Sequence, residues 1–447
     1  MVDLNALNAP RIVVEPPGPK VREILRMGGQ NPAEYVQPIV EEARGIFIKD
    51  PDGNVFIDLI SGRCVANVGH CHPRVVEALQ RQVARGLHGL TESRLRLNNR
   101  LSEITPGGFP KRVFYGQSGS AMNDLGIKVA RWSTRRPYIV AFAGAYHGVT
   151  YGALSVSSYR PYMIKGFHPN LPGVYHFPYP YCYRCPFGRE HPDCDLACLR
   201  YMEEYAFKSY LPPEEVAAVI FEPIAGDAGW HVPPDDWLPT LKEICDRHGI
   251  LLIAEEVQTG FGRTGRWFAV EHWGVEPDIL LLGKAISCGV PNAACVVRAD
   301  LCERETGERI RTGHTFSGSP LGCAAALANI EVIEEEGLVE NSARMGDYMK
   351  RRLTEMMDCH RVIGDVRGLG LLIGVEIVRD RETKKPGVEE AERITARAFK
   401  RGLYLVNMGS FGTRVLRVAP PLIINREQAD AALERLEAAI SDVEREL

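Results

Sequence analysis

One lysine of this chain stands at the end of an apolar run, where its amine could take part in covalent chemistry. Residues 279–282 are Ile-Leu-Leu-Leu, Gly283 follows, and Lys284 comes next. A short run of this kind is typical of a fully buried strand. An apolar surrounding disfavours the ammonium form of lysine, so the amine of Lys284 could act as a nucleophile that forms a Schiff base. The alternative interpretation of Lys284 is a solvated charge just past a strand.

A second apolar run ends in two carboxylates. Residues 250–254 are Ile-Leu-Leu-Ile-Ala, and the sequence EEVQTGFGRTG occupies positions 255–265. Carboxylates at the end of a buried strand cost free energy unless a cationic partner meets them. The protonated pyridine nitrogen of pyridoxal phosphate is such a partner. Glu255 and Lys284 are therefore the candidate catalytic residues.

Lys284 and the segment 255–265 resemble the class III, or ω-type, pyridoxal-phosphate-dependent aminotransferases of fold type I, such as 4-aminobutyrate and ornithine aminotransferases. The resemblance covers almost the whole chain. It implies pyridoxal 5'-phosphate as the cofactor. It also implies a ping-pong transfer of an amino group from an amino acid or ω-amine, such as 4-aminobutyrate, to a 2-oxo acid through the Lys284 Schiff base. Glu255 departs from the family pattern, which normally has Asp, and the extra methylene moves the carboxylate by about 1.5 Å.

The same resemblance assigns the residues that hold the cofactor. The run GQSGS at 116–120 precedes a predicted helix, whose free backbone N–H groups suit a phosphate. Tyr146 would cover one face of the ring and Val257 the other. The complete set of cofactor-binding residues that the resemblance implies is Ser118, Gly119, Ser120, Tyr146, His147, Glu255, Val257, Gln258, Lys284 and Thr315, the last reaching the cofactor of a neighbouring protomer.

Three further residues are candidates for substrate binding. Glu222 follows the apolar run 216–221, and it resembles the family's gate carboxylate, which pairs with an arginine and swings aside for a substrate carboxylate. The candidate arginine is Arg417, because a buried Arg in a strand-like run favours a bidentate carboxylate partner. Arg63 stands where relatives usually carry an apolar residue. It is either a second partner for a substrate carboxylate or a solvated side chain.

Other functions use the same scaffold. An amino-acid racemase or epimerase would employ the same lysine and an added proton donor, and a dialkylglycine decarboxylase would release carbon dioxide. A non-catalytic cofactor-binding regulator is disfavoured, because the chain has no appended DNA-binding segment. An enzyme built on a metal would depend on the cysteines instead.

Four of the twelve cysteines are close together in the sequence. They follow a C-x2-C-x8-C-x3-C pattern and are Cys182, Cys185, Cys194 and Cys198. This spacing is compatible with a structural zinc or iron–sulfur site, with two disulfides, or with free thiols packed in an insertion. The resemblance requires no metal.

Length and strand–helix order predict the architecture. A chain of 447 residues exceeds one ordinary core, so we expect two domains. Alternating strands and helices between about 110 and 300 predict an α/β domain with a largely parallel sheet covered by helices. With the resemblance, this becomes a large cofactor domain with a mostly parallel seven-stranded sheet and a smaller α/β domain from the two chain ends. The predicted boundaries are 1–60 for the N-terminal arm and part of the small domain, 61–323 for the large domain with a cysteine-rich insertion at about 178–200, and 324–447 for the C-terminal small domain.

Composition excludes several classes of partner. The net charge of −4 gives no indication of nucleic acid or an anionic membrane as partner. No apolar run approaches the roughly 18 residues of a membrane span, and the N-terminus has no signal pattern, so we expect a cytoplasmic protein. The expected partners are a small amine or amino acid and a 2-oxo acid. The resemblance implies a homodimer, or a dimer of dimers, with shared active sites.

Two helices are predicted from apolar periodicity. Pro73 suits a first helical turn, and Val76, Leu79, Val83 and Leu87 then fall on one face. Near the C-terminus, Asn425 is a predicted N-cap, followed by a helix whose apolar face is Leu433, Leu436, Ile440 and Val443.

Overall fold

The structure is a computed structural model that describes residues 3–168 and 170–447. The chain divides into two compact units. The large unit contains Glu77–Phe261 and Arg266–Glu331, and the small unit contains the residues up to Val76 together with Gly262–Gly265 and Val332–Leu447. The predicted domain boundaries, at 60/61 and 323/324, lie 16 and 8 residues before the corresponding ends of these units at 76/77 and 331/332.

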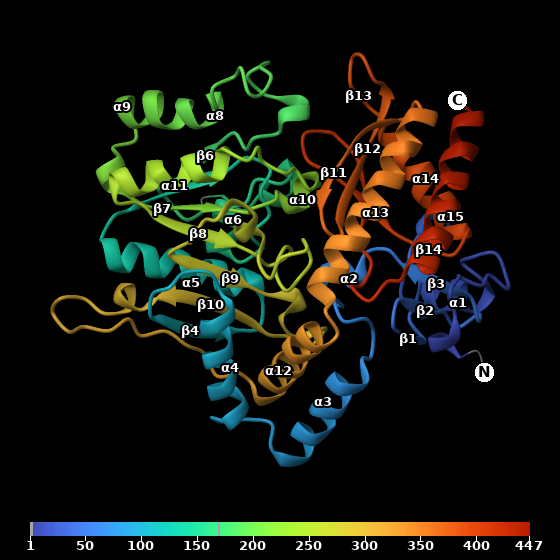
Figure 1. The fold of residues 1–447 in the computed structure, drawn as a ribbon, viewed down its shortest axis with the longest axis horizontal. Helices are drawn as coiled ribbons and strands as arrows, with labels where there is room; N and C mark the ends of the chain where they lie inside the picture. The colour runs from blue at the N-terminus through green and yellow to red at the C-terminus, as the bar shows by residue number, and fades with distance from the viewer. Residues whose placement is uncertain (1–2, 169) are drawn as a thin grey trace. The chain divides into compact units, whose positions relative to one another are not determined.

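The large unit is built on one seven-stranded sheet (Figure 1). In spatial order its strands are β4 (Lys111–Gly116), β10 (Ala293–Arg298), β9 (Ile279–Leu282), β8 (Leu251–Glu255), β7 (Val216–Phe221), β5 (Tyr138–Phe142) and β6 (Val174–Phe177). Strand β10 is antiparallel to both of its neighbours, and the other neighbouring pairs are parallel. The predicted α/β class and mostly parallel seven-stranded sheet are confirmed.

Helices cover both faces of this sheet because its central strands are apolar on both sides. Every residue of β7, β8 and β9 is buried. Helix α5 (Gly119–Thr134) packs on one face, where Leu125 and Val129 join the core. Helix α11 (Trp237–His248) covers the other face, and the Trp237 ring lies 5.3 Å from the ring of Phe142 in β5. Two helix-covered faces leave the strand ends as the place for polar chemistry.

The remaining helices that belong wholly to the large unit are short or lie beside the sheet. They are α4 (Glu92–Ile104), α6 (Tyr151–Val156), α7 (Pro161–Ile164), η3 (Cys182–Arg184), α8 (Ala197–Arg200), η4 (Tyr201–Ala206), α9 (Phe207–Ser209), η5 (Pro213–Glu215), α10 (Gly226–Gly229), η6 (Ala269–Trp273), η7 (Lys284–Ser287) and η8 (Ala299–Cys302). Helices α3 (Pro73–Arg85) and α12 (Pro320–Glu335) each contain a boundary between the two units.

The small unit contains two sheets. The first has the order β1 (Glu42–Arg44), β2 (Phe47–Lys49), β3 (Val55–Asp58) and β14 (Leu403–Tyr404). The second has the order β11 (Ile363–Leu369), β12 (Leu372–Asp380), β16 (Val415–Val418) and β15 (Val406–Met408), with β13 (Lys385–Pro386) paired to β12. Its helices are η1 (Leu4–Ala6), α1 (Pro19–Met27), η2 (Pro32–Glu34), the turn α2 (Ser61–Cys64), α13 (Leu338–Cys359), α14 (Val388–Lys400) and α15 (Arg426–Arg445).

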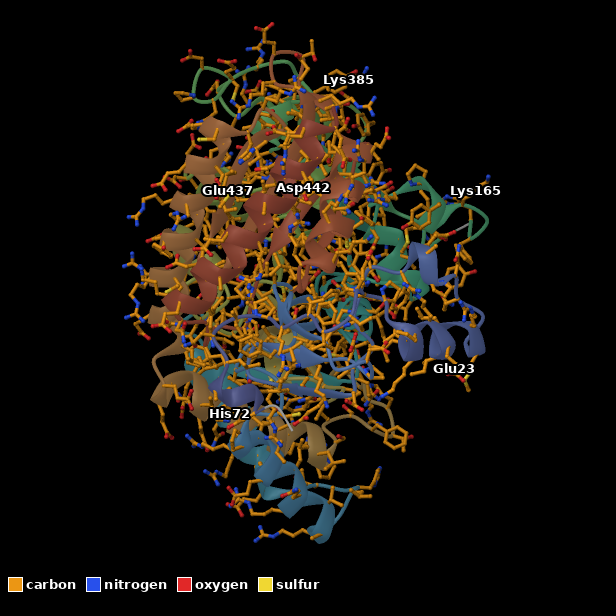
Figure 2. All side chains as sticks on the ribbon, turned by 90° about the vertical axis from the view of Figure 1, so that its right-hand side faces the viewer. Glu23, His72, Lys165, Lys385, Glu437 and Asp442 are labelled. Carbon is orange, nitrogen blue, oxygen red and sulfur yellow. The ribbon has the colours of Figure 1, made fainter. Side chains whose placement is uncertain are left out.

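The final helix agrees with its predicted pattern. Asn425 caps α15, because its side chain accepts a hydrogen bond from the Gln428 N–H and the Gln428 side-chain oxygen accepts one from the Asn425 N–H. The predicted apolar face is fully buried and consists of Leu433, Leu436, Ile440 and Val443. Figure 2 shows Glu437 and Asp442 on the same helix, where Asp442 forms an ion pair with Arg401.

The apolar face predicted for α3 is not part of a core. Val83 and Leu87 are each 57% exposed, and Val75 is the buried residue of this helix. Apolar periodicity in the sequence indicates that a helix has an apolar face, but it does not indicate what covers that face. No helix in the described part of the chain is both long and apolar enough to cross a membrane.

Candidate active site

Glu255 ends strand β8, and both of its carboxylate oxygens are engaged. Oε1 accepts a hydrogen bond of 2.8 Å from the Val257 N–H, and Oε2 lies 3.2 Å from Nδ1 of His147. Glu255 is 5% exposed and His147 is 2% exposed. The chain backbone and one imidazole therefore hold this carboxylate in a fixed position at the edge of the sheet.

Lys284 lies at the end of the neighbouring strand, β9, which pairs with β8 in parallel. The Lys284 side chain is half-buried, and its φ of 43° is in the left-handed region. Between the two strand ends, Val257 packs so tightly that a Cβ on Gly283 would lie 3.1 Å from its Cγ1 and a Cβ on Gly119 would lie 3.0 Å from its Cγ2. Val257 therefore fixes the spacing between the Lys284 turn and the start of α5.

Glu222 follows β7 and is buried, with 5% of its surface exposed. Burial raises the pKa of this carboxyl well above its ordinary value, the nearby Glu255 and Asp227 carboxylates raise it further, and the Lys284 ammonium opposes the rise. The Tyr179 hydroxyl donates to the backbone oxygens of Glu222 and Pro223, at 3.0 and 3.1 Å. The ends of β7, β8 and β9 thus bring three acids and one lysine into a single neighbourhood.

Gln258 connects this neighbourhood to helix α10. Its side-chain N–H donates to Asp227 Oδ1 at 2.8 Å, and its side-chain oxygen accepts from the indole N–H of Trp230 at 3.1 Å. Neither Asp227 nor Trp230 was predicted from the sequence. Their only signal was an acid four residues after the Glu222-Pro223 pair, which is too short a pattern to interpret alone.

The residues predicted to bind the cofactor phosphate lie at the N-terminal end of α5. Ser118 caps the helix by accepting from the Ala121 N–H. The Ser120 hydroxyl lies 2.9 Å from the Thr150 hydroxyl and accepts from the Thr150 N–H. Asn123 joins both segments, since its amide donates to Gly119 O and to His147 O. Thr150 was missed because it follows β5 through a loop whose path depends on contacts with distant residues such as Ser120.

Three other predicted site residues are Tyr146, Thr315 and Arg417, and each has its own surroundings. Tyr146 is half-buried, and its ring packs edge-on against Tyr159 at 6.3 Å. Thr315 is exposed, and its backbone oxygen accepts from His88 at 3.0 Å. Arg417 is 3% exposed in β16 of the small unit, so its pairing with Glu222 of the large unit stays a prediction.

Arg63 occupies a left-handed turn in the small unit. Ser61, Gly62, Arg63 and Cys64 have φ values of 45°, 61°, 66° and 61°. Each non-glycine residue in this region costs roughly 1–2 kcal/mol, so other contacts must hold the turn. Asp58 supplies them by accepting from the Ile60 and Gly62 N–H groups, and His70 lies 2.8 Å from it.

The predicted cofactor residues of the large unit fit pyridoxal phosphate. A helix N-terminus flanked by the Ser120 and Thr150 hydroxyls suits its phosphate, and a buried carboxylate, Glu255, suits its ring nitrogen. His147 supplies an additional observation, because its Nε2 is buried without a hydrogen-bond partner in the described residues. The half-buried amine of Lys284 suits the aldehyde.

The four clustered cysteines lie in the large unit, away from these groups in the sequence. All four are free thiols that line one cavity of about 20 Å³. Burial raises the pKa of the Cys182 thiol to about 11, and the other three thiols add to the rise. Over residues 3–168 and 170–447, no three or more His, Cys, Asp or Glu side chains are arranged to hold a metal ion as they stand.

Comparison with known proteins identifies the class. Residues 30–440 match the family described as Aminotransferase class-III. The alanine/serine racemase of Pyrococcus horikoshii is 41% identical over 97% of this chain and 93% of its own length. The probable 4-aminobutyrate aminotransferase of Bacillus subtilis is 35% identical over 89% and 92%. A crystal structure of a transaminase from the marine bacterium Virgibacillus is 30% identical, covers 96% of this chain and 100% of its own, and superposes with a TM-score of 0.86.

The chain belongs to the class III aminotransferase family, which confirms the resemblance stated from Lys284 and residues 255–265. It is an enzyme of this family, and pyridoxal 5'-phosphate is its cofactor. Racemases and aminotransferases both occur among its relatives, so family membership defines the cofactor chemistry and leaves the reaction to be argued from the site.

Proposed function

We propose that the protein interconverts the two configurations of an α-amino acid at Cα, as an amino-acid racemase or epimerase. The observation that carries the proposal is the Asp227 carboxylate, which Gln258 holds at 2.8 Å in the cluster that also contains Glu222 and Lys284. The higher identity to the alanine/serine racemase, 41% against 35% for the aminotransferase, supports the same choice.

Racemisation depends on the side from which a proton returns to Cα. When bound, pyridoxal phosphate withdraws the electron pair left at Cα. Lys284 removes the Cα proton from one side, and inversion requires a second group that delivers a proton from the opposite side. Asp227 is our candidate for that group, because Gln258, whose own side-chain oxygen accepts from Trp230, donates to it and holds it in place. Glu255 holds the cofactor nitrogen, and the Ser118–Ser120 segment and Thr150 hold its phosphate.

The test is chiral analysis of an enantiopure α-amino acid incubated with the holoenzyme in deuterated water without any 2-oxo acid. We expect loss of enantiomeric purity with incorporation of deuterium at Cα. We also expect Asp227→Asn to slow inversion by about 100-fold or more, while exchange with retention of configuration continues at Lys284. Turnover that appears only after a 2-oxo acid is supplied would reject racemisation.

Amino-group transfer from an amino acid or ω-amine to a 2-oxo acid is the second candidate function. Glu222 favours it, because a buried carboxyl beside Lys284 matches the gate role that pairs with Arg417 and lets one site accept substrates with and without an α-carboxylate. A spectral screen of amine donors, which follows conversion of the bound cofactor to its amine form, distinguishes this function. Stable conversion with 4-aminobutyrate would favour it over racemisation.

We also propose that the active protein is at least a homodimer. Exposed apolar side chains gather around the segment after α3, where the His88 ring lies 6.3 Å from the Phe316 ring. The apolar members are Val83, Leu87, Leu90, Leu95 and Phe316, each more than half exposed. Water-exposed apolar groups in one region mark an association surface. The neighbouring Thr315 supports the expectation of a site shared between protomers.

A further inference from the structure

The segment between β6 and α8 contains the four clustered cysteines and little regular structure. Over residues 178–196 its only helical element is η3, Cys182–Arg184. Its outer part is tied to the rest of the large unit by His191, whose Nε2 lies 3.0 Å from Asp236 Oδ1. A segment of this length that forms few helix or strand hydrogen bonds gains little stability from its own secondary structure.

The four clustered cysteines of this segment line one small cavity. Cys182, Cys185, Cys194 and Cys198 all line the same cavity of about 20 Å³, with Phe187 and other apolar side chains around it. A cavity needs about 10–15 Å³ to hold one water-sized particle. The space therefore matches a single water-sized particle or ion.

The chain presents the cysteines in two close pairs. A turn closes after the first pair, where the Gly188 N–H donates to Cys185 O at 3.0 Å, and the second pair begins at a turn where the Ala197 N–H donates to Cys194 O at 3.1 Å. Cysteine pairs separated by two to four residues are the usual ligand pairs of tetrahedral zinc sites, since one tight turn can direct both sulfur atoms to one side.

We propose that this segment binds one divalent metal ion of the zinc type through the thiolates of Cys182, Cys185, Cys194 and Cys198. Four soft sulfur ligands in a tetrahedron select such an ion. Since the side chains are not yet arranged as a finished metal centre, binding draws the sulfur atoms together and releases their protons to solvent. The ion then stabilises the segment. This site is independent of the reaction at Lys284.

Two disulfides fit the observations less well. A disulfide places its sulfur atoms about 2.05 Å apart and so fills the space between them. Two such bridges would pair the cysteines without requiring a void that all four share. The shared cavity is the feature that favours a single central ion.

The experiment uses the full-length holoenzyme purified under reducing conditions without added metal. Its zinc and iron content is measured, the metal is removed with a chelator, and the protein is titrated with cobalt(II). We expect one metal per chain and the absorption bands of tetrahedral cobalt thiolate, which zinc abolishes by displacement. Cys182→Ser and Cys194→Ser, one from each pair, should weaken cobalt binding by more than about tenfold. Cys359→Ser, an exposed cysteine outside the cluster, should not change it.

Several results would overturn the proposal. They are the absence of thiolate bands, bands that persist in both cluster variants, iron with stoichiometric sulfide, or, in a separate preparation purified without a reductant, fewer than twelve thiols titratable after denaturation, which would indicate disulfides. If the serine variants do not fold, amide exchange of the parent protein replaces them. Zinc should then increase protection over residues 178–200, and unchanged protection contradicts the proposal.

Discussion

Oε2 of Glu255 lies 3.2 Å from Nδ1 of His147, and both side chains are buried. The other oxygen of Glu255 accepts the Val257 N–H, so the longer side chain found here in place of the family's usual Asp is anchored at two points. The extra methylene does not leave the carboxylate loose. It is accommodated by contacts with a backbone turn and an imidazole.

This anchoring predicts distinct effects of charge and length at position 255. Glu255→Gln keeps the length but removes the charge proposed to hold the protonated cofactor nitrogen, so we expect activity to fall by 100-fold or more. Glu255→Asp keeps the charge but shortens the side chain by about 1.5 Å, and such a displacement costs about 10- to 100-fold. A pH titration of the bound cofactor's absorbance measures the effect without turnover. An unchanged titration in the Gln variant would show that Glu255 does not contact the ring.

The close approach of Gly226 to Glu222 predicts that a side chain added at position 226 would displace Glu222. A Cβ added at Gly226 would lie 2.8 Å from Oε1 of Glu222 and 3.1 Å from the amide carbon of Gln258. Gly226→Ala should therefore displace both side chains and lower kcat/KM by about 10- to 100-fold. Gly108→Ala is the matched control, because a Cβ there meets no atom within 4 Å. Equal activity of the two variants would argue that Glu222 has no part in the site.

Glu256 predicts a pH dependence of stability. Burial raises its pKa to about 7, although Thr259 and the Ala269 and Val270 N–H groups donate hydrogen bonds to it. Between about pH 4.5 and 7 the Glu256 carboxyl is ionised in the unfolded state and protonated in the folded state. The free energy of unfolding therefore falls as pH rises through this range, by about 3 kcal/mol from this residue.

The measurement is denaturant unfolding at several pH values for the parent and Glu256→Gln. The difference in unfolding free energy between the two should decrease from pH 4.5 to 7, because the amide does not titrate. Glu214→Gln, at an exposed carboxylate, is the control and should follow the parent. A pH-independent difference for Glu256→Gln would show that Glu256 is already ionised in the folded protein.

The exposed apolar residues near α3 predict an assembly defect. Leu90 is 70% exposed and Phe316 is 61% exposed, and a charge at either position would be buried if they meet a second chain. Leu90→Asp and Phe316→Asp should therefore shift the protein toward monomer, as measured by light scattering. Met27→Asp, at an apolar residue that is 82% exposed in α1, should leave the mass unchanged. A dimer that survives both charged variants would place the interface elsewhere.

The sequence was most informative where a whole element is apolar. The runs at 216–221, 250–254 and 279–282 formed buried neighbouring strands, so Glu222, Glu255 and Lys284 came together at one edge of the sheet. Parallel pairing explains this success, because it aligns the carboxyl ends of the strands.

Contacts between distant loops could not be predicted in this way. Gln258 binds Asp227 and Trp230 because the short helix α10 turns back toward β8, and no local pattern reports that turn. The apolar face of α3 was recognised from its periodicity, but its covering surface could not be predicted, because sequence periodicity does not identify what covers an apolar face.

Chemical trapping of the lysine that carries the cofactor tests the account most directly. Borohydride reduction of the holoenzyme, followed by peptide mass spectrometry, should locate a stable phosphopyridoxyl group on Lys284 in stoichiometric amount. Lys284→Ala should lose the label and the absorbance of the bound aldehyde. A label on any other lysine, or unlabelled Lys284 in fully active protein, would contradict the assignment on which the proposed reaction depends.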